Sequence, residues 1–182
     1  TAVSRALRGE SNSSEAMKER VRQVAGKLNY QPNSIAKSLR TNRTKTLGLI
    51  ISDSTLSLFA NLIEGIERTA ADHGYNIILC NVQSNAARER EAVRTLTNKR
   101  IDGLMLAASL LTSKKDKEFL DSFGVPYIFL VRRCEYDEGN YLVNDNCEGT
   151  YKMIDHMVKT GSREIYFINI SSTITTFRDR LD

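Results

Sequence analysis

Short apolar runs alternate with helical stripes through most of the chain after residue 46. Four of these runs have the length and composition of buried strands, at 47–51 (LGLII), 76–82 (NIILCNV), 103–108 (GLMLAA) and 127–131 (YIFLV). Apolar residues recur at helical spacing between the runs, in 58–70, 86–98 and 115–123. Strand and helix in this alternation, with short connections, predict right-handed βαβ units and a parallel sheet. The expected fold class is α/β.

The pattern continues in the last third of the chain. It predicts a short strand at 141–143 (YLV), a helix at 147–159 and a further strand at 164–170 (EIYFINI). Open parallel sheets bind ligands in the loops beyond the carboxyl ends of their strands. The loops expected to hold a ligand therefore follow Ile51, Val82, Ala107, Val131, Val143 and Ile170.

Residues 1–46 differ from the rest, because they predict short helices joined by polar turns. Ser14 is a candidate N-cap for a helix whose apolar residues recur at helical spacing, namely Met17, Val21, Val24 and Leu28. Pro32 stops this helix. The next helical segment, 33–39, spans only about two turns, whereas an isolated helix in water needs about 12–15 residues. We expect it to be ordered only when something holds it.

Positive charge is concentrated at the start of the chain. Residues 1–46 contain ten lysines and arginines against three glutamates, a net charge of +7, whereas the whole chain carries +4. The remaining residues therefore carry a net charge of −3. A basic head on a mildly acidic body indicates that the head meets a polyanion, although charge alone also fits a merely solvated basic arm.

The chain lacks the sequence motifs of several classes of protein. The chain contains no run of eighteen apolar residues, no secretory signal, and none of the motifs GxGxxG, GxxxxGK[ST], GxSxG or HExxH. Its three cysteines form no CxxC pair and no metal-ligand spacing with the two histidines. We expect reduced thiols in a cytoplasm, with Cys80 as a small core residue. We expect no membrane span, metal, cofactor or catalytic site.

Seven stretches in order along the chain share the pattern of one known family. They are AVSRAL (2–7), YQPNSIAKSLRT (30–41), LGLIISD (47–53), FANLIEGIE (59–67), HGY (73–75), KRIDGLMLA (99–107) and NDNCEG (144–149). In these stretches the chain resembles the LacI/GalR family of bacterial transcription regulators. The resemblance implies a partial helix-turn-helix DNA-binding domain at 1–32, a hinge helix and linker at 33–46, and a core like a periplasmic sugar-binding protein at 47–182. It also implies that the sequence is truncated at both ends.

The resemblance assigns DNA contacts to two segments of the head. The recognition helix contributes Thr1, Ser4 and Arg5, and the hinge helix contributes Asn33, Ala36, Lys37, Leu39 and Arg40. Arginine suits the major groove because it binds guanine O6 and N7 with two hydrogen bonds. Leu39 matches the apolar wedge that opens a base step and kinks the DNA from the minor groove. Without the resemblance, Ser4 and Arg5 would be interpreted as surface residues and Leu39 as a packing residue.

The resemblance also assigns effector contacts in the core, to Leu58, Phe59, Arg132, Asp145 and Arg180. Two departures from the family pattern change the expected pocket. Leu58 replaces an aromatic residue that usually follows Asn-Pro in the first ligand loop, which changes the expected shape of the effector. Val131 stands before Arg132 where the family usually has Asp or Gly. Phe59 fits the pocket and the core equally well.

Together these residues predict a cytoplasmic repressor that is not an enzyme. We expect a homodimer, with pairing into tetramers left open, that binds a palindromic operator in double-stranded DNA and responds to a sugar or sugar derivative. The main alternative is a periplasmic sugar-binding protein of a transporter, which shares the core fold but lacks the basic head. An enzyme on this fold is the second alternative, and the missing catalytic motifs oppose it.

Overall fold

The computed structural model of the chain consists of two units, Thr1–Thr44 and Lys45–Asp182. The structure describes residues 3, 6, 14–28, 30, 41, 43–54, 56–107, 109–136, 139–169 and 174–181. In the first unit, helix α2 (Glu15–Lys27) begins where the sequence predicts, because the Ser14 side chain accepts a hydrogen bond from the Met17 N–H at 3.4 Å. Pro32 and the segment 33–39 lie outside the described residues.

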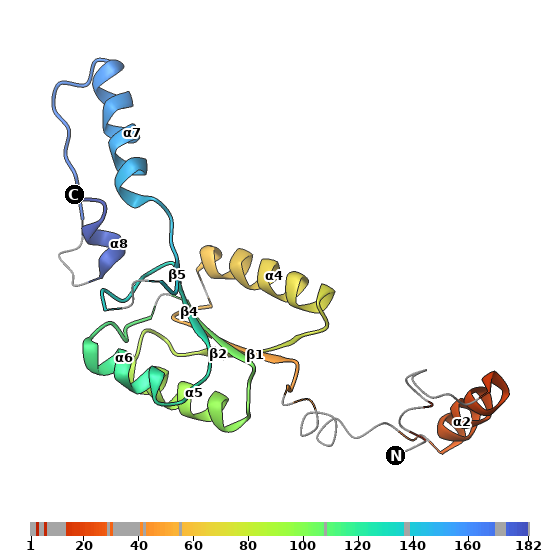
Figure 1. Cartoon of the computed structure of the whole chain (residues 1–182). Coiled ribbons are helices and arrows are strands. Elements are labelled where there is room, and N and C mark those ends of the chain that lie inside the picture. The colour runs from red at the N-terminus through yellow and green to blue at the C-terminus, as the bar shows by residue number, and fades with distance from the viewer. Residues whose placement is uncertain are drawn as a thin grey trace. The chain divides into compact units, whose positions relative to one another are not determined.

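The second unit contains the predicted parallel sheet. Its strands are β1 (Thr46–Ile51), β2 (Asn76–Asn81), β3 (Gly103–Ala107), β4 (Tyr127–Leu130) and β5 (Tyr141–Leu142). They are arranged in the order β2-β1-β3-β4-β5, and every neighbouring pair is parallel. The α/β fold class predicted from the sequence is confirmed (Figure 1).

Helices connect the strands and cover both faces of the sheet. They are α4 (Ser57–Asp72), α5 (Ala86–Asn98) and α6 (Lys114–Asp121). Two further helices, α7 (Asn146–Lys159) and α8 (Thr175–Arg178), follow β5. Figure 1 shows α4 on one face of the sheet and α5 with α6 on the other. The helices predicted at 58–70, 86–98, 115–123 and 147–159 are confirmed to within two residues at each end. None of the described helices is both long and apolar enough to span a bilayer.

Each face of the sheet has its own apolar cluster. The cluster under α5 and α6 includes Ile50, Val93, Leu96, Leu106, Leu120 and Phe129. The cluster under α4, which we call the α4-face cluster, is formed by Leu49, Ile51, Phe59, Ala107 and Leu130. Consecutive residues of β1 thus alternate between the two clusters, as strand geometry requires. Cys80 packs half-buried against the first cluster, as expected.

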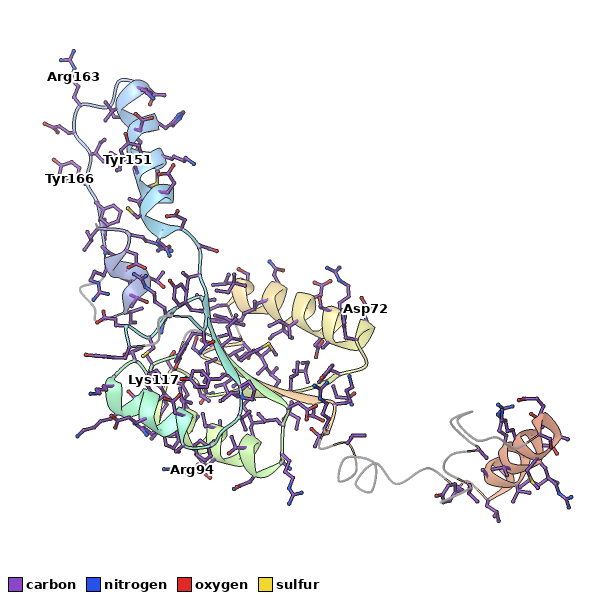
Figure 2. The ribbon with its side chains drawn as sticks, viewed as in Figure 1. Asp72, Arg94, Lys117, Tyr151, Arg163 and Tyr166 are labelled. Atoms are coloured by element: carbon purple, nitrogen blue, oxygen red, sulfur yellow. The ribbon has the colours of Figure 1, made fainter. Side chains whose placement is uncertain are left out.

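The strand predicted at 164–170 is wrong. Residues 162–169 have no regular secondary structure, and among the described residues no strand pairs with them. Tyr166 is 85% exposed and Ile168 is 97% exposed, and Figure 2 shows Tyr166 and Arg163 projecting from this segment. An apolar alternating run becomes a strand only where a neighbouring strand satisfies its backbone groups and a layer covers its side chains. This segment has neither in the described part of the chain.

Candidate ligand site at the carboxyl edge of the sheet

The carboxyl ends of the parallel strands meet at one edge of the sheet. Side-chain and backbone bonds connect the loops after β1 and β2 there. The Asn81 amide donates to Ser54 Oγ at 2.7 Å, and the Ser84 N–H donates to the Ser52 carbonyl at 2.9 Å. These contacts hold the two loops together.

The two predicted effector residues at the start of α4 lie in different environments. Leu58 is 53% exposed, whereas Phe59 is 2% exposed. Phe59 packs in the α4-face cluster with Leu49 and Ile51. Of the two places that the sequence allows for Phe59, the structure has it in the core, and only Leu58 is available to a ligand.

A buried glutamate holds the loop after β3. Glu89 lies on the inner face of α5 and is 2% exposed. Its carboxylate accepts a hydrogen bond from the Leu110 N–H at 2.9 Å, and Ser109 bonds the same carboxyl group. Burial raises the pKa of Glu89, and the two hydrogen bonds and the charge of Arg132 oppose this shift. Sequence reasoning missed this residue, although Glu89 shares the helical spacing of the buried Val93 and Leu96.

A second acidic group fixes the start of α6 beside this loop. Asp116 is 8% exposed and forms a capping box with Ser113, whose hydroxyl donates to the Asp116 carboxylate at 2.6 Å. Arg90 of α5 forms an ion pair with the same carboxylate. The loop after β3 and the first turn of α6 are therefore both held to α5.

Arg132, a predicted effector residue, follows β4 at the same edge and is half-buried. Burial lowers the pKa of its guanidinium, and the charge of Glu89 opposes that shift. The next residue, Arg133, forms an ion pair with Asp179 at 2.7 Å between Nη2 and Oδ1. Two consecutive arginines thus have different acidic partners, one in α5 and one after α8.

The remaining predicted effector residues, Asp145 and Arg180, lie on either side of Asn146. The Asp145 side chain caps α7 by accepting from the Glu148 N–H at 3.0 Å. Arg180 Nε donates to Asn146 Oδ1 at 3.0 Å. The fold therefore brings two residues 35 positions apart to the same helix end, and it places a carboxylate and a guanidinium at the sheet edge.

Helix α8 is attached to the loop after β4. The Thr176 hydroxyl donates to the Val131 carbonyl at 2.9 Å, and the Arg133 N–H donates to Thr175 Oγ1 at 3.2 Å. Thr175 is 1% exposed. These bonds, together with the ion pair between Arg178 and Glu135, attach α8 to this loop. Among the described residues, no three histidine, cysteine or acidic side chains are grouped as metal ligands would be.

Comparison with protein families accounts for both units. Residues 44–181 match the family of periplasmic binding proteins and sugar binding domains of the LacI family, and residues 1–33 match the lacI family of bacterial regulatory proteins. The chain belongs to the LacI family. Its core is of the periplasmic-binding-protein type.

Curated relatives are about 30% identical to this chain over the matched stretch. It is 30% identical over 166 residues to the HTH-type transcriptional repressor PurR of Vibrio atlanticus, covering 91% of this chain and 49% of that protein. It is 29% identical over 162 residues to the HTH-type transcriptional regulator RegA of Clostridium acetobutylicum, covering 88% of this chain and 48% of that protein. The chain spans about half the length of the curated relatives it matches.

Solved structures share the fold. The Lac repressor dimer bound to operator and the anti-inducer ONPF superposes with a TM-score of 0.84 at 24% identity, over 98% of this chain and 54% of that one. The complex of the regulator CelR with cellobiose superposes with a TM-score of 0.65 at 25% identity, over 98% and 54% of the respective chains. The arrangement of the described elements is therefore that of LacI-family proteins.

The DNA-binding residues that the LacI-family resemblance assigns lie outside the described residues. This holds for Thr1, Ser4, Arg5, Asn33, Ala36, Lys37, Leu39 and Arg40. Their roles remain predictions from the sequence. The described part of the head consists mainly of α2, which has no buried residue. Its Met17 and Val24 are exposed, as is Leu28, the residue that follows the helix.

Proposed function

We propose that this protein is a sequence-specific DNA-binding transcriptional regulator, a repressor, controlled by a small sugar-like effector. In this proposal residues 1–32 bind operator DNA, residues 33–46 form the hinge, and residues 47–182 form the effector-binding core. The net charge of +7 on residues 1–46 supports a polyanionic partner for the head. The curated relatives are named as transcriptional regulators, which supports regulation rather than catalysis.

The contact between Arg180 and Asn146 carries the effector part of the proposal. It attaches Arg180 to the first residue of α7, whose cap is Asp145, beyond the carboxyl end of β5 where open parallel sheets bind ligands. Sugar hydroxyls both donate and accept hydrogen bonds, so a carboxylate and a guanidinium at the same helix end can satisfy them. We infer that Asp145 accepts from the effector, while Arg180 and Arg132 donate to it and the exposed Leu58 contacts an apolar face.

The proposed control is thermodynamic linkage between the effector and the operator. The effector binds two conformations of the core unequally, and the favoured conformation changes the ordering of the hinge segment 33–39. That segment is too short to be a stable helix alone, so a modest bias in the core changes its population. A homodimer in the cytoplasm would place two heads on a palindromic operator.

A ligand screen tests the effector part. The full-length protein is mixed with cellobiose, which the related CelR binds, and with ribose and glucose 6-phosphate, and its melting temperature Tm is measured. A ligand at 100 times its Kd stabilises the folded protein by about 2.7 kcal/mol, which raises Tm by several degrees. We expect the ligand that raises Tm to change operator affinity as well. An equal rise of Tm in Asp145→Ala and Arg180→Ala would place the site elsewhere.

A further inference from the structure

Val131, directly after β4, has a left-handed backbone conformation with φ of +71°. In this conformation the Cβ of an L residue crowds the following carbonyl oxygen, and a β-branched side chain makes the crowding worse. A valine adopts it only where surrounding contacts hold it there. The position lies at the carboxyl edge of the sheet, one residue before Arg132.

The left-handed conformation breaks the alternation of side chains along β4. Ile128 and Leu130 face the α4-face cluster, so a regular strand would turn Val131 to the opposite face and Arg132 back to the α4 face. Val131 instead packs against the same cluster as Leu130. An unbroken strand would direct the Arg132 guanidinium toward the apolar residues under α4. In the structure its charge instead lowers the pKa of Glu89, in α5 on the other side of the sheet, and the charge of Glu89 raises the pKa of Arg132, in each case against the larger effect of burial.

Two hydrogen bonds hold the backbone of Val131, and they have different consequences. Its N–H donates to the Leu142 carbonyl at 3.0 Å, which merely continues the ladder between β4 and β5. Its carbonyl accepts from the Thr176 hydroxyl at 2.9 Å. Turning the backbone at Val131 out of the strand conformation redirects this carbonyl. The Thr176 bond therefore favours the left-handed conformation over a regular strand, together with the packing of Val131 against the α4-face cluster.

We propose that Thr176 is a positioning residue that, through the backbone of Val131, turns Arg132 away from the α4-face cluster and toward Glu89 at the effector site. The side chain of Thr176 acts on the ligand only through Arg132. The inference rests on the proposed function for the statement that Arg132 contacts an effector. The direction of Arg132 itself is independent of that function.

The first test measures the Glu89 carboxyl group directly, by ¹³C NMR titration of the full-length protein, with Glu89→Gln identifying its signal. Arg132 lowers the pKa of Glu89, whereas Asp116 raises it and is itself paired with Arg90. Thr176→Val keeps the shape of the side chain and removes the hydroxyl. We expect it to raise the pKa of Glu89 in the same direction as Arg132→Ala.

A matched control removes the same kind of hydrogen bond elsewhere. The Thr97 hydroxyl donates to the Val93 carbonyl at 2.9 Å within α5, away from the loop after β4. Thr97→Val should leave the pKa of Glu89 unchanged. A general loosening of the fold by a lost hydroxyl would not separate these two variants.

A glycine at position 131 tests whether Thr176 acts through the backbone conformation of Val131. Glycine adopts positive φ without steric crowding, so Val131→Gly should need no help from Thr176. The double variant Val131→Gly with Thr176→Val should therefore return the pKa of Glu89 to its wild-type value. An unchanged pKa in Thr176→Val, an unchanged pKa in Arg132→Ala, or a double variant no different from Thr176→Val would each overturn the proposal.

The second test measures how the bond between Thr176 and Val131 affects ligand binding, with cellobiose and ribose as the probes. We expect Thr176→Val to weaken the binding of the active probe about tenfold in calorimetry, and Thr97→Val to leave it unchanged. If the wild-type protein binds neither probe and neither changes operator affinity, the result contradicts the proposed effector class. The titration of Glu89 still decides the direction of Arg132 in that case, so the two failures are distinguishable.

Discussion

Arg180 Nε lies 3.0 Å from Asn146 Oδ1, which connects the end of α8 to the first turn of α7. Asp145, the cap of α7, is the residue directly before Asn146. The contact makes one polar group out of residues that are far apart in sequence, and it stands at the edge where the loops after β4 and β5 meet.

Replacing Arg180 should therefore weaken the binding of the effector and leave the binding of DNA by the head intact. Arg180→Ala removes the donor and leaves Asn146 Oδ1 to water, so we expect at least a tenfold loss of effector affinity in calorimetry, about 1.4 kcal/mol or more. Effector-free DNA binding should change less than twofold. Arg163→Ala, which removes the same charge from the exposed segment 162–169, is the control. Equal effects of the two variants on the effector would contradict the assignment.

Glu89 should make the stability of the core fall as the pH rises. Burial raises its pKa in the folded protein above the ordinary value of 4.5, so the folded state holds the proton over a range where the unfolded state has lost it. Stability from this group is complete below about pH 4.5 and is lost as pH rises through the folded pKa. The loss is about 1.4 kcal/mol for every tenfold difference between the proton affinities of the folded and unfolded states.

Urea unfolding of the full-length protein between pH 4.5 and 8 measures this effect. Glu89→Gln keeps an oxygen for the Leu110 N–H but cannot ionise, so its free energy of unfolding should decline less over this range than that of the wild type. Glu91→Gln, on the exposed side of the same helix, should follow the wild type. A parallel decline in all three proteins would contradict the assignment.

Gly48 should tolerate no side chain. A Cβ at this position in β1 would lie 2.9 Å from Cδ1 of both Ile101 and Leu96, which pack in the cluster under α5. We expect Gly48→Ala to destabilise the core by about 1–3 kcal/mol through overpacking. Gly65→Ala, within α4 and with nothing within 4 Å of the added Cβ, should instead stabilise by about 0.5–1 kcal/mol. Thermal unfolding of both variants measures these changes in stability, and a Gly48→Ala protein as stable as the wild type would contradict the prediction.

Leu39 is the residue through which we expect the hinge to bend DNA. Inserting an apolar side chain between base pairs costs a few kcal/mol of stacking, which is offset by contacts that the bent DNA allows. Leu39→Ala removes the wedge and keeps Lys37 and Arg40, so specific operator affinity and bending should fall while weak non-specific binding stays. Gel-shift measurements of bending and affinity test this. Normal bending by the variant would refute the wedge.

The sequence predicted the helices and strands correctly wherever local patterns determine the structure. Helix α5 has the predicted bounds, because Asn85 caps its start by accepting from the Ala87 and Arg88 N–H groups, and its apolar stripe faces the sheet. The parallel sheet followed from the alternation of strand and helix. The strand at 164–170 failed because strand formation depends on a neighbour, which periodicity alone cannot supply.

The site depended more heavily on tertiary contacts. The resemblance assigned Arg132, Asp145 and Arg180, and the fold placed all three at the carboxyl edge of the sheet. The sequence could not reveal the role of Glu89, which depends on a bond to Leu110, 21 residues away. Nor could it reveal the backbone conformation of Val131, although a valine where the family usually has Asp or Gly was visible in the sequence.

Selection from a random DNA library by the full-length protein tests the central claim most directly, because it needs no knowledge of the effector. We predict enrichment of a palindrome with two half-sites. We also predict that affinity for this DNA falls about a thousandfold or more between 50 and 200 mM salt, since the head binds phosphates and releases counterions. A library without an enriched sequence, or an affinity indifferent to salt, would contradict the proposed function.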